Sequence, residues 1–192
     1  MDLFTYMDDD IYRICVSGSH AKENPFQHYL DFLYELGELS EDEQKLYAGI
    51  GREFIQTIET TEVQKVYKMP ILYSFYNHGN IRLAVTDEEV LESWKEFFDT
   101  GTNWKDFSNV NTYEDYKKVT DKQHLSKAKR MPIRFLKASG KGFFVEKDGY
   151  ALALRDEIGD FVGNMAFGEQ MGDVLGYRSL EYYRRRYEKG QY

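Results

Sequence analysis

Basic residues are concentrated in one short stretch of this sequence. Residues 117–141 read KKVTDKQHLSKAKRMPIRFLKASGK and hold nine Lys and Arg against a single acid, Asp121. Such side chains bind the phosphates of a nucleic-acid backbone, and the binding weakens with salt because counterions are released. The candidate phosphate-binding residues of this stretch are Lys122, Lys127, Lys129, Arg130, Arg134, Lys137 and Lys141.

The spacing of these cations indicates a helix. The five residues that step by three or four are Lys127, Arg130, Arg134, Lys137 and Lys141, and they share one face if the helix continues through Pro132. Apolar residues mark the rest of this helix, namely Leu125, Ala128, Phe135 and Leu136. Three interpretations stay open: contact with a nucleic acid, contact with an acidic protein surface, and simple solvation. The near absence of acids favours the first, because a solvated face usually mixes both signs.

A second basic group ends the chain, in the sequence LEYYRRRYEKGQY. On a helix, successive residues are about 100° apart, so Arg184 to Arg186 fan out over about 200° and do not all face one ligand. Arg184 is kept as one further candidate for a backbone contact. The residues that share one side of this helix and indicate a docking side are Leu180, Tyr183 and Tyr187.

The residues that could support catalysis form no recognisable set. The sequence lacks the phosphate-binding loop, the dinucleotide fingerprint, the HExxH zinc motif and CxxC. No close pair among His20, His28, His78 and His124 has metal-ligand spacing, and a single cysteine cannot supply a structural zinc site. The histidine in YNHGN (76–80) is expected at a helix end. We therefore expect no enzymatic activity, no cofactor and no metal.

The composition is that of a globular protein. The 192 residues are 42% hydrophobic and 30% charged, with a formal net charge of -8. The single cysteine, Cys15, fits a reducing compartment. No basic start with an apolar run and no 18-residue apolar segment occurs, so we expect a cytoplasmic protein without a membrane partner. The charge is uneven, because residues 1–100 carry a net -12 and residues 101–192 a net +4.

Apolar periodicity and capping patterns predict the elements that would position the basic stretch. The expected helices lie at 25–36, 43–58, 62–78, 87–98, 122–139 and 156–189, the last with a break at Gly163 and Asn164. Short strands are expected at 11–16 and 81–85, and a hairpin at 142–155 turns around Asp148-Gly149. Pro70 either kinks the third helix or begins a new one, and 99–122 forms a long insertion.

The order of helix, strand, helix, basic helix and hairpin is that of a winged-helix domain, in which the helix before the hairpin can enter a major groove. We therefore expect an α+β, mainly helical fold. It would comprise an N-terminal helical segment (1–59), a winged-helix-like domain (60–155) and a C-terminal helical arm (156–192). The long insertion before the basic helix departs from the tight turn of ordinary helix-turn-helix units.

Four phrases of the sequence carry a resemblance to a known family. They are ETTEVQKVYKMPILYSFYNHGNIRLAV, VLESWKEFFDTGTNWKDF, KRMPIRFLKASGKGFFVEKDGYALALRDEI and LEYYRRRY. They resemble a region near the C-terminus of large bacterial DEAD/DEAH-box helicases, some of which act in restriction and phage defence. The resemblance covers about residues 25–189, and none of the motor motifs is present. It implies an accessory region that holds DNA beside a motor or docks a partner.

Together, these observations predict a non-enzymatic, DNA-associated accessory module of a helicase-type defence system. The basic helix and the hairpin would contact the nucleic-acid backbone, and motor domains would be the protein partner. The alternative is an acidic protein-interaction module, or an inhibitor, that binds a nuclease or helicase. Its binding surface would be the acidic first half of the chain and its aromatic helix faces.

Overall fold

The structure, a computed structural model, describes residues 24–190 and is mainly helical, with one small antiparallel sheet. The chain forms two compact units: unit 1 combines the residues up to Thr61 with those from Asp160 onward, and unit 2 runs from Glu62 to Gly159. The segments 1–59 and 156–192, which the sequence treats as separate, therefore contribute mostly to one unit. The expected strand at 11–16, together with Cys15 and His20, lies outside the described residues.

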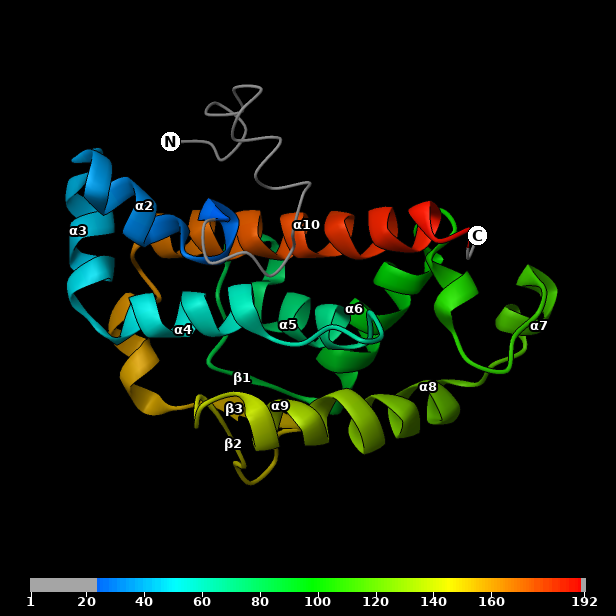
Figure 1. Ribbon diagram of the computed structural model, residues 1–192. Helices are drawn as coiled ribbons and strands as arrows, with labels where there is room; N and C mark the ends of the chain where they lie inside the picture. The colour runs from blue at the N-terminus through cyan, green and yellow to red at the C-terminus, as the bar shows by residue number, and fades with distance from the viewer. Residues whose placement is uncertain (1–23, 191–192) are drawn as a thin grey trace. The chain divides into compact units, whose positions relative to one another are not determined.

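Unit 1 is helical throughout its described residues. After a 3-10 turn at Pro25–Gln27, its helices are α2 (Tyr29–Leu36), α3 (Glu41–Ala48), α4 (Ile50–Thr60) and α10 (Met165–Glu188). Helix α10 runs beside α4 and also contacts α3 (Figure 1). As predicted, Asn164 begins α10, because its side chain accepts a hydrogen bond from the Phe167 N–H.

The prediction of one continuous helix at 43–58 is wrong, because the helix is interrupted at Gly49, between α3 and α4. A Cβ at Gly49 would lie 2.6 Å from the Phe161 ring, and one at Gly51 would lie 2.2 Å from Leu46 Cδ1. Close packing thus requires glycine at both positions. The core beneath them includes Phe54 and Phe167, whose ring centroids are 5.7 Å apart.

Unit 2 holds the sheet and the basic helix. Its helices are α5 (Lys68–Tyr76), α6 (Asp87–Asp99), α7 (Tyr113–Lys117), α8 (Asp121–Ala128) and α9 (Arg134–Ser139). Short 3-10 turns lie at Asn77–Gly79, Asn103–Asp106 and Asp156–Phe161, and the last of them extends into the first residues of the second segment of unit 1. Pro70 lies in the first turn of α5 and so begins a new helix. The predicted helix end at YNHGN is confirmed: Asn77 and His78 are left-handed and Gly79 follows with φ 91°.

Three short antiparallel strands form the sheet of unit 2. They are β1 (Ala84–Val85), β2 (Phe144–Val145) and β3 (Leu152–Leu154), in the order β1-β3-β2. Residue Ala84 pairs with Ala153, and Phe144 pairs with Leu154. The hairpin between β2 and β3 turns at the expected place, where Gly149 has a φ of 83° that favours glycine.

An aromatic core holds the helices of unit 2 together. The side chains of Trp94 and Phe98 on α6 are fully buried, and their ring centroids are 5.0 Å apart. The insertion at 99–122 packs onto this core: the Phe107 ring lies 5.6 Å from Phe98, and the Tyr67 hydroxyl donates to the Asp106 carbonyl at 2.7 Å. The insertion is therefore fixed beside α6 and leads directly into α8.

Candidate nucleic-acid interface

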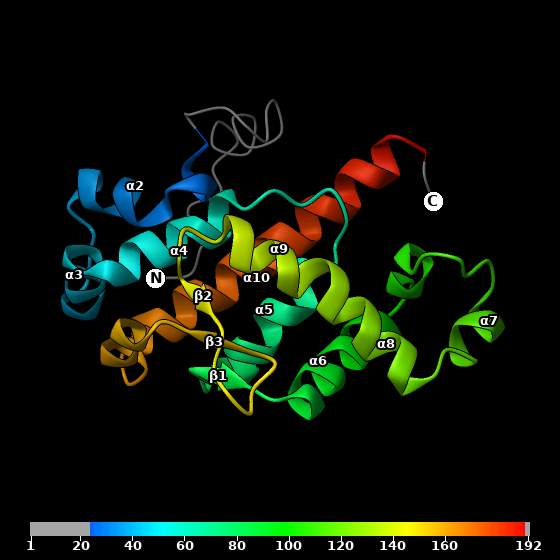
Figure 2. The same ribbon diagram turned by 90° about the horizontal axis from the view of Figure 1, so that it is seen from below.

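The basic stretch forms one continuous helical segment. Helix α8 passes into a π turn at Lys129–Ile133 and then into α9, and the junction residues Lys129 and Arg134 keep right-handed helical angles (Figure 2). Pro132 lies inside the π turn. Proline has no N–H to donate to the preceding turn, and a wider turn accommodates this loss without ending the helix.

The π turn decides which side chains of this helix face the core. The buried residues follow one stripe, His124, Ala128, Pro132, Ile133 and Leu136. Two neighbours, Pro132 and Ile133, are both buried because the wide turn adds a residue to the stripe. Phe135, one of the apolar residues that mark this helix, lies outside the buried stripe, and its side chain is 47% exposed.

Two of the candidate cations are neutralised by carboxylates. The Lys129 ammonium lies 2.6 Å from Asp87 at the start of α6, and Lys137 pairs with Glu146 at the end of β2. In each pair at least one partner is largely exposed, and exposed pairs contribute about 0–1 kcal/mol to stability. These two lysines therefore anchor the helix to its neighbours more than they offer free charge.

Lys127 has a different environment, because its ammonium lies over two aromatic rings. The distances are 4.7 Å to the Phe107 centroid and 5.2 Å to the Tyr67 centroid. Burial lowers the pKa of Lys127, and the positive charges of Lys65 and Arg130 lower it further. These three cations therefore lie close together, and we call Lys65, Lys127 and Arg130 the basic cluster.

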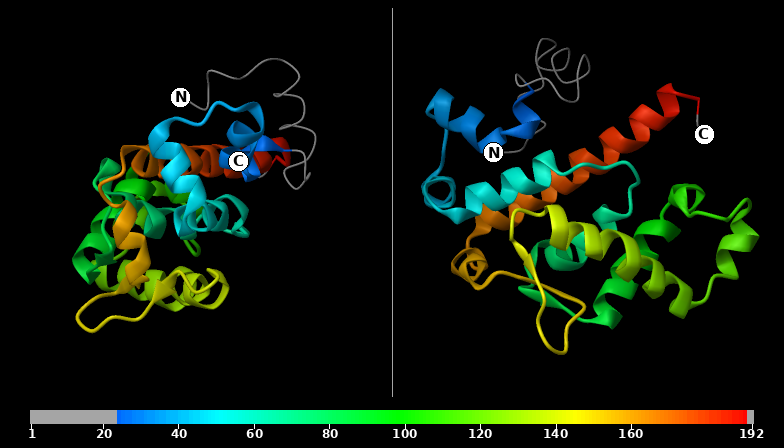
Figure 3. Two further views of the ribbon diagram at one scale, coloured as in Figure 1. Left: turned by 90° about the vertical axis from the view of Figure 1, so that its left-hand side faces the viewer. Right: turned by 60° about the horizontal axis from the view of Figure 1, so that its bottom comes forward.

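Three more candidates extend the basic surface along the segment. The side chains of Lys122, Arg134 and Lys141 are exposed, and within residues 24–190 none of them makes an ion pair with a carboxylate. The Arg134 guanidinium lies 5.8 Å from the centroid of the exposed Phe135 ring. Figure 3 shows how the helical segment leads into the β2–β3 hairpin. Lys141 lies in the connection between α9 and β2.

Arg184, the further candidate, lies in unit 1 on α10. Its guanidinium donates to Glu188 at 2.6 Å. The expected docking side at the chain end is also corrected, since Leu180 is 62% and Tyr187 76% exposed. The buried side of this helix end carries Arg178, Glu181 and Tyr182 instead.

Sequence reasoning missed two residues of the surface. Lys65 joins the basic cluster from the segment before α5, and distance along the chain hid this proximity. Lys147 lies in the β2–β3 hairpin, 5.7 Å from the centroid of the exposed Tyr150 ring. The hairpin signal around Asp148-Gly149 could have identified Lys147, because it placed this lysine beside the turn.

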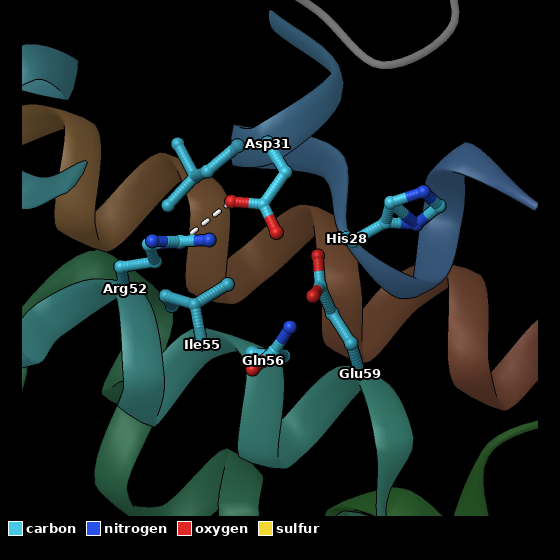
Figure 4. Close-up of a pocket in the computed structure, with 7 residues that line it drawn as sticks. His28, Asp31, Arg52, Ile55, Gln56 and Glu59 are labelled. Atoms are coloured by element: carbon cyan, nitrogen blue, oxygen red, sulfur yellow. Dashed lines mark ion pairs between the residues drawn. The ribbon is translucent and has the colours of Figure 1, made fainter. Parts of the chain in front are cut away.

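Unit 1 has a shallow depression between α2 and α4 that encloses no cavity. Two of its polar side chains form an ion pair, in which Arg52 Nε lies 2.6 Å from Asp31 (Figure 4). A third, Glu59, accepts a hydrogen bond from the backbone N–H of Tyr29 at 3.0 Å. Burial raises the pKa of Glu59 to about 8, and the nearby Asp31 charge contributes to the rise. The Glu59 carboxyl is therefore mostly neutral at pH 7.

No helix among residues 24–190 combines the length and the apolar character needed to cross a membrane. No three His, Cys, Asp or Glu side chains in this range come together as a metal site. No protein-family model, curated protein or solved structure matches the chain.

Proposed function

We propose that unit 2 contacts the sugar-phosphate backbone of DNA through the basic helical segment and the β2–β3 hairpin. The observation that carries this proposal is the basic cluster. Burial lowers the pKa of Lys127, the charges of Lys65 and Arg130 lower it further, and none of the three cations makes an ion pair with a carboxylate in residues 24–190. Like charges held together are costly unless a polyanion neutralises them, and a phosphate backbone is such a polyanion.

The order of elements supports a winged-helix arrangement of this surface. Helix α5, strand β1, helix α6, the basic segment and the β2–β3 hairpin follow in that order, and β3 pairs with both other strands. In the proposed binding mode the basic segment lies along a groove, and Lys141 and Lys147 beside and within the hairpin touch the adjacent backbone. These contacts position the module on DNA without reading its sequence.

The resemblance to the C-terminal region of DEAD/DEAH-box helicases suggests the system in which the proposed DNA contact would operate. A module of this kind would work without catalysis of its own, beside motor domains of a defence-related system. Its part would be to hold the nucleic acid. The motor domains are thus the proposed protein partner.

A binding experiment tests the proposal directly. Fluorescence anisotropy measures the affinity of the full chain for a labelled 20-base-pair duplex and for the matching single strand, from 50 to 200 mM salt. We expect log K to fall steeply with log[salt], by about 0.9 for each phosphate neutralised on a duplex. The double variant Lys65→Glu/Arg130→Glu should weaken binding at every salt concentration and reduce that slope.

The control variant is Lys137→Gln. It removes a cation from the same segment, but one that Glu146 already neutralises, so its effect should be clearly smaller. Absence of binding by the unaltered chain at 50 mM salt contradicts the proposal. Lys137→Gln changes the net charge by one unit and the double variant changes it by four. Equal losses of binding free energy per unit of charge in the two variants would assign the binding to net charge alone and contradict a specific role of the basic cluster.

A further inference from the structure

Unit 1 presents an ordered stack of aromatic and charged side chains on α2, α3 and α4. The rings of Tyr34 and Tyr47 are nearly parallel, 10° apart, with centroids separated by 4.5 Å. The Arg52 guanidinium lies 4.5 Å from the Tyr47 centroid. Asp31 fixes this guanidinium through the contact of 2.6 Å to Nε, and the contact raises the pKa of Arg52 (Figure 4).

One end of the stack is open. Tyr34 covers one face of the Tyr47 ring, so Arg52 occupies space over the other face. The series therefore runs Asp31, Arg52, Tyr47 and Tyr34, and it ends in a side chain that is 58% exposed. A tyrosine ring attracts a guanidinium to its face through the ring quadrupole. The free face of Tyr34 offers the place at which a second guanidinium would continue the series.

The exposed charged residues that follow Tyr34 in the sequence up to the start of α3 are acidic. Glu35 follows Tyr34 directly, Glu38 lies just after α2, and Glu41 begins α3; all three are exposed, and none makes an ion pair within residues 24–190. The neighbouring Lys45 is engaged by Asp42 at 2.9 Å. An acidic surface of this kind repels nucleic acids and attracts cations, which selects a basic occupant.

We propose that the surface formed by Tyr34, Glu35, Glu38 and Glu41 docks a basic segment of another protein. An arginine of that segment stacks on the free face of Tyr34, and its neighbouring basic residues face the three carboxylates. We call these four residues the acidic docking surface. The inference rests on unit 1 alone and goes beyond the proposed DNA contact of unit 2, so either can fail without the other.

Two synthetic peptides serve as probes for the full chain, a fluorescein-labelled (Gly-Arg)₄ and the matching (Gly-Lys)₄. We expect the arginine peptide to bind more tightly, because a guanidinium stacks on an aromatic face and an ammonium does so less well. Tyr34→Ala should weaken binding of the arginine peptide about two- to fivefold, the range expected for one exposed cation–π contact. Tyr34→Phe should keep the affinity, since the ring remains.

The matched control is Tyr150→Ala, which removes a comparably exposed tyrosine from unit 2. It should leave the affinity for the arginine peptide unchanged. Charge reversal with Glu35→Lys/Glu38→Lys should weaken both peptides and reduce their salt dependence. Circular dichroism of each variant verifies that the fold is intact.

Several results would overturn the proposal. Absence of peptide binding at low salt would do so, as would equal affinities of the two peptides combined with no effect of Tyr34→Ala. Sedimentation velocity distinguishes the remaining occupant: if the chain self-associates and Tyr34→Ala dissociates it, a second copy covers this surface, and docking of another protein is refuted.

Discussion

Replacement of Glu59 by glutamine should change how the stability of unit 1 depends on pH. The Glu59 side chain on α4 is 1% exposed, and burial raises its pKa to about 8 from an ordinary value of 4.5. Between these two values the folded protein keeps a proton that the unfolded chain has lost. The free energy of unfolding therefore falls as pH rises through this window.

The size of the effect follows from the two pKa values. Each pH unit inside the window costs about 1.4 kcal/mol, and the dependence flattens near pH 8 as the folded carboxyl itself ionises. From pH 6 to pH 8, Glu59 should remove about 2 kcal/mol from the free energy of unfolding. Glutamine has nearly the same shape and does not titrate. The difference in stability between Glu59→Gln and the unaltered chain should therefore rise by about 2 kcal/mol over this range.

Urea unfolding at pH 6, 7 and 8 measures this difference. Both tryptophans of the chain, Trp94 and Trp104, lie in unit 2, so tryptophan fluorescence follows unit 2 alone. Circular dichroism at 222 nm follows the helices of both units, and the part of its transition that fluorescence does not share reports on unit 1. The control is Glu53→Gln, which removes an exposed carboxylate from the same helix, and its difference from the unaltered chain should stay constant. Parallel pH curves for Glu59→Gln and the unaltered chain would show that the Glu59 carboxyl is ionised in both states, which refutes the reasoning.

Three further predictions concern one closely packed glycine, one buried histidine and one buried ion pair. Gly140→Ala should cost about 1–3 kcal/mol, because its Cβ would lie 2.5 Å from a backbone carbonyl, whereas Gly163→Ala meets nothing within 4 Å and should be neutral in urea unfolding. Burial lowers the pKa of His124, so the free energy of unfolding of unit 2 should fall as pH drops below about 6.5. His124→Gln should abolish this pH dependence, measured by tryptophan fluorescence during unfolding. Arg178→Met removes the 3.3 Å partner of the buried Glu181, which keeps only a longer contact of 3.9 Å to Arg185. The loss of stability by circular dichroism should therefore stay below the roughly 3–5 kcal/mol of a fully unpaired buried charge, and the double variant with Glu181→Leu should recover most of it.

The elements that the sequence predicts well are those whose determinants are local. Ser40 with Glu43 and Thr86 with Glu89 form capping boxes, a pattern of the kind that predicts helix starts, in which side chain and backbone bond reciprocally within one turn. The break at Asn164 is equally local, because its side chain caps α10. Such signals need no knowledge of the rest of the fold.

The features that the sequence does not predict depend on residues far apart in the chain. The break at Gly49 is coupled to close packing of the Phe161 ring, which comes from the other segment of unit 1. In the sequence, His124 is a polar residue of a basic helix. In the structure its side chain is buried and accepts a hydrogen bond from Trp94 Nε1 at 3.2 Å. Phe135 is one of the apolar residues of the predicted helix, yet it lies outside the buried stripe that passes through the π turn at Pro132, and its side chain is exposed.

The number of cations in the sequence is a local signal, whereas the charge available to a ligand depends on contacts with residues far apart in the chain. Nine basic residues between 117 and 141 predict a strongly basic surface, yet Lys118, Lys129 and Lys137 face carboxylates within 4 Å. A phosphate that displaces one of these partners replaces an existing ion pair, so its net gain is small. Affinity for a polyanion should therefore follow the cations that lack such a partner in residues 24–190.

That distinction sets an upper limit on the expected salt dependence. The exposed cations of unit 2 that contact no carboxylate in the described residues and lie in or near the proposed surface are Lys65, Lys122, Arg130, Arg134, Lys141 and Lys147. If all of them touch phosphates of a duplex, the slope of log K against log[salt] is about -5, at roughly -0.9 for each contact. A steeper slope would require the paired lysines to exchange their carboxylates for phosphates. The ion pairs of Lys129 and Lys137 would then act as switches that open on binding, and Asp87→Asn would strengthen binding by releasing Lys129.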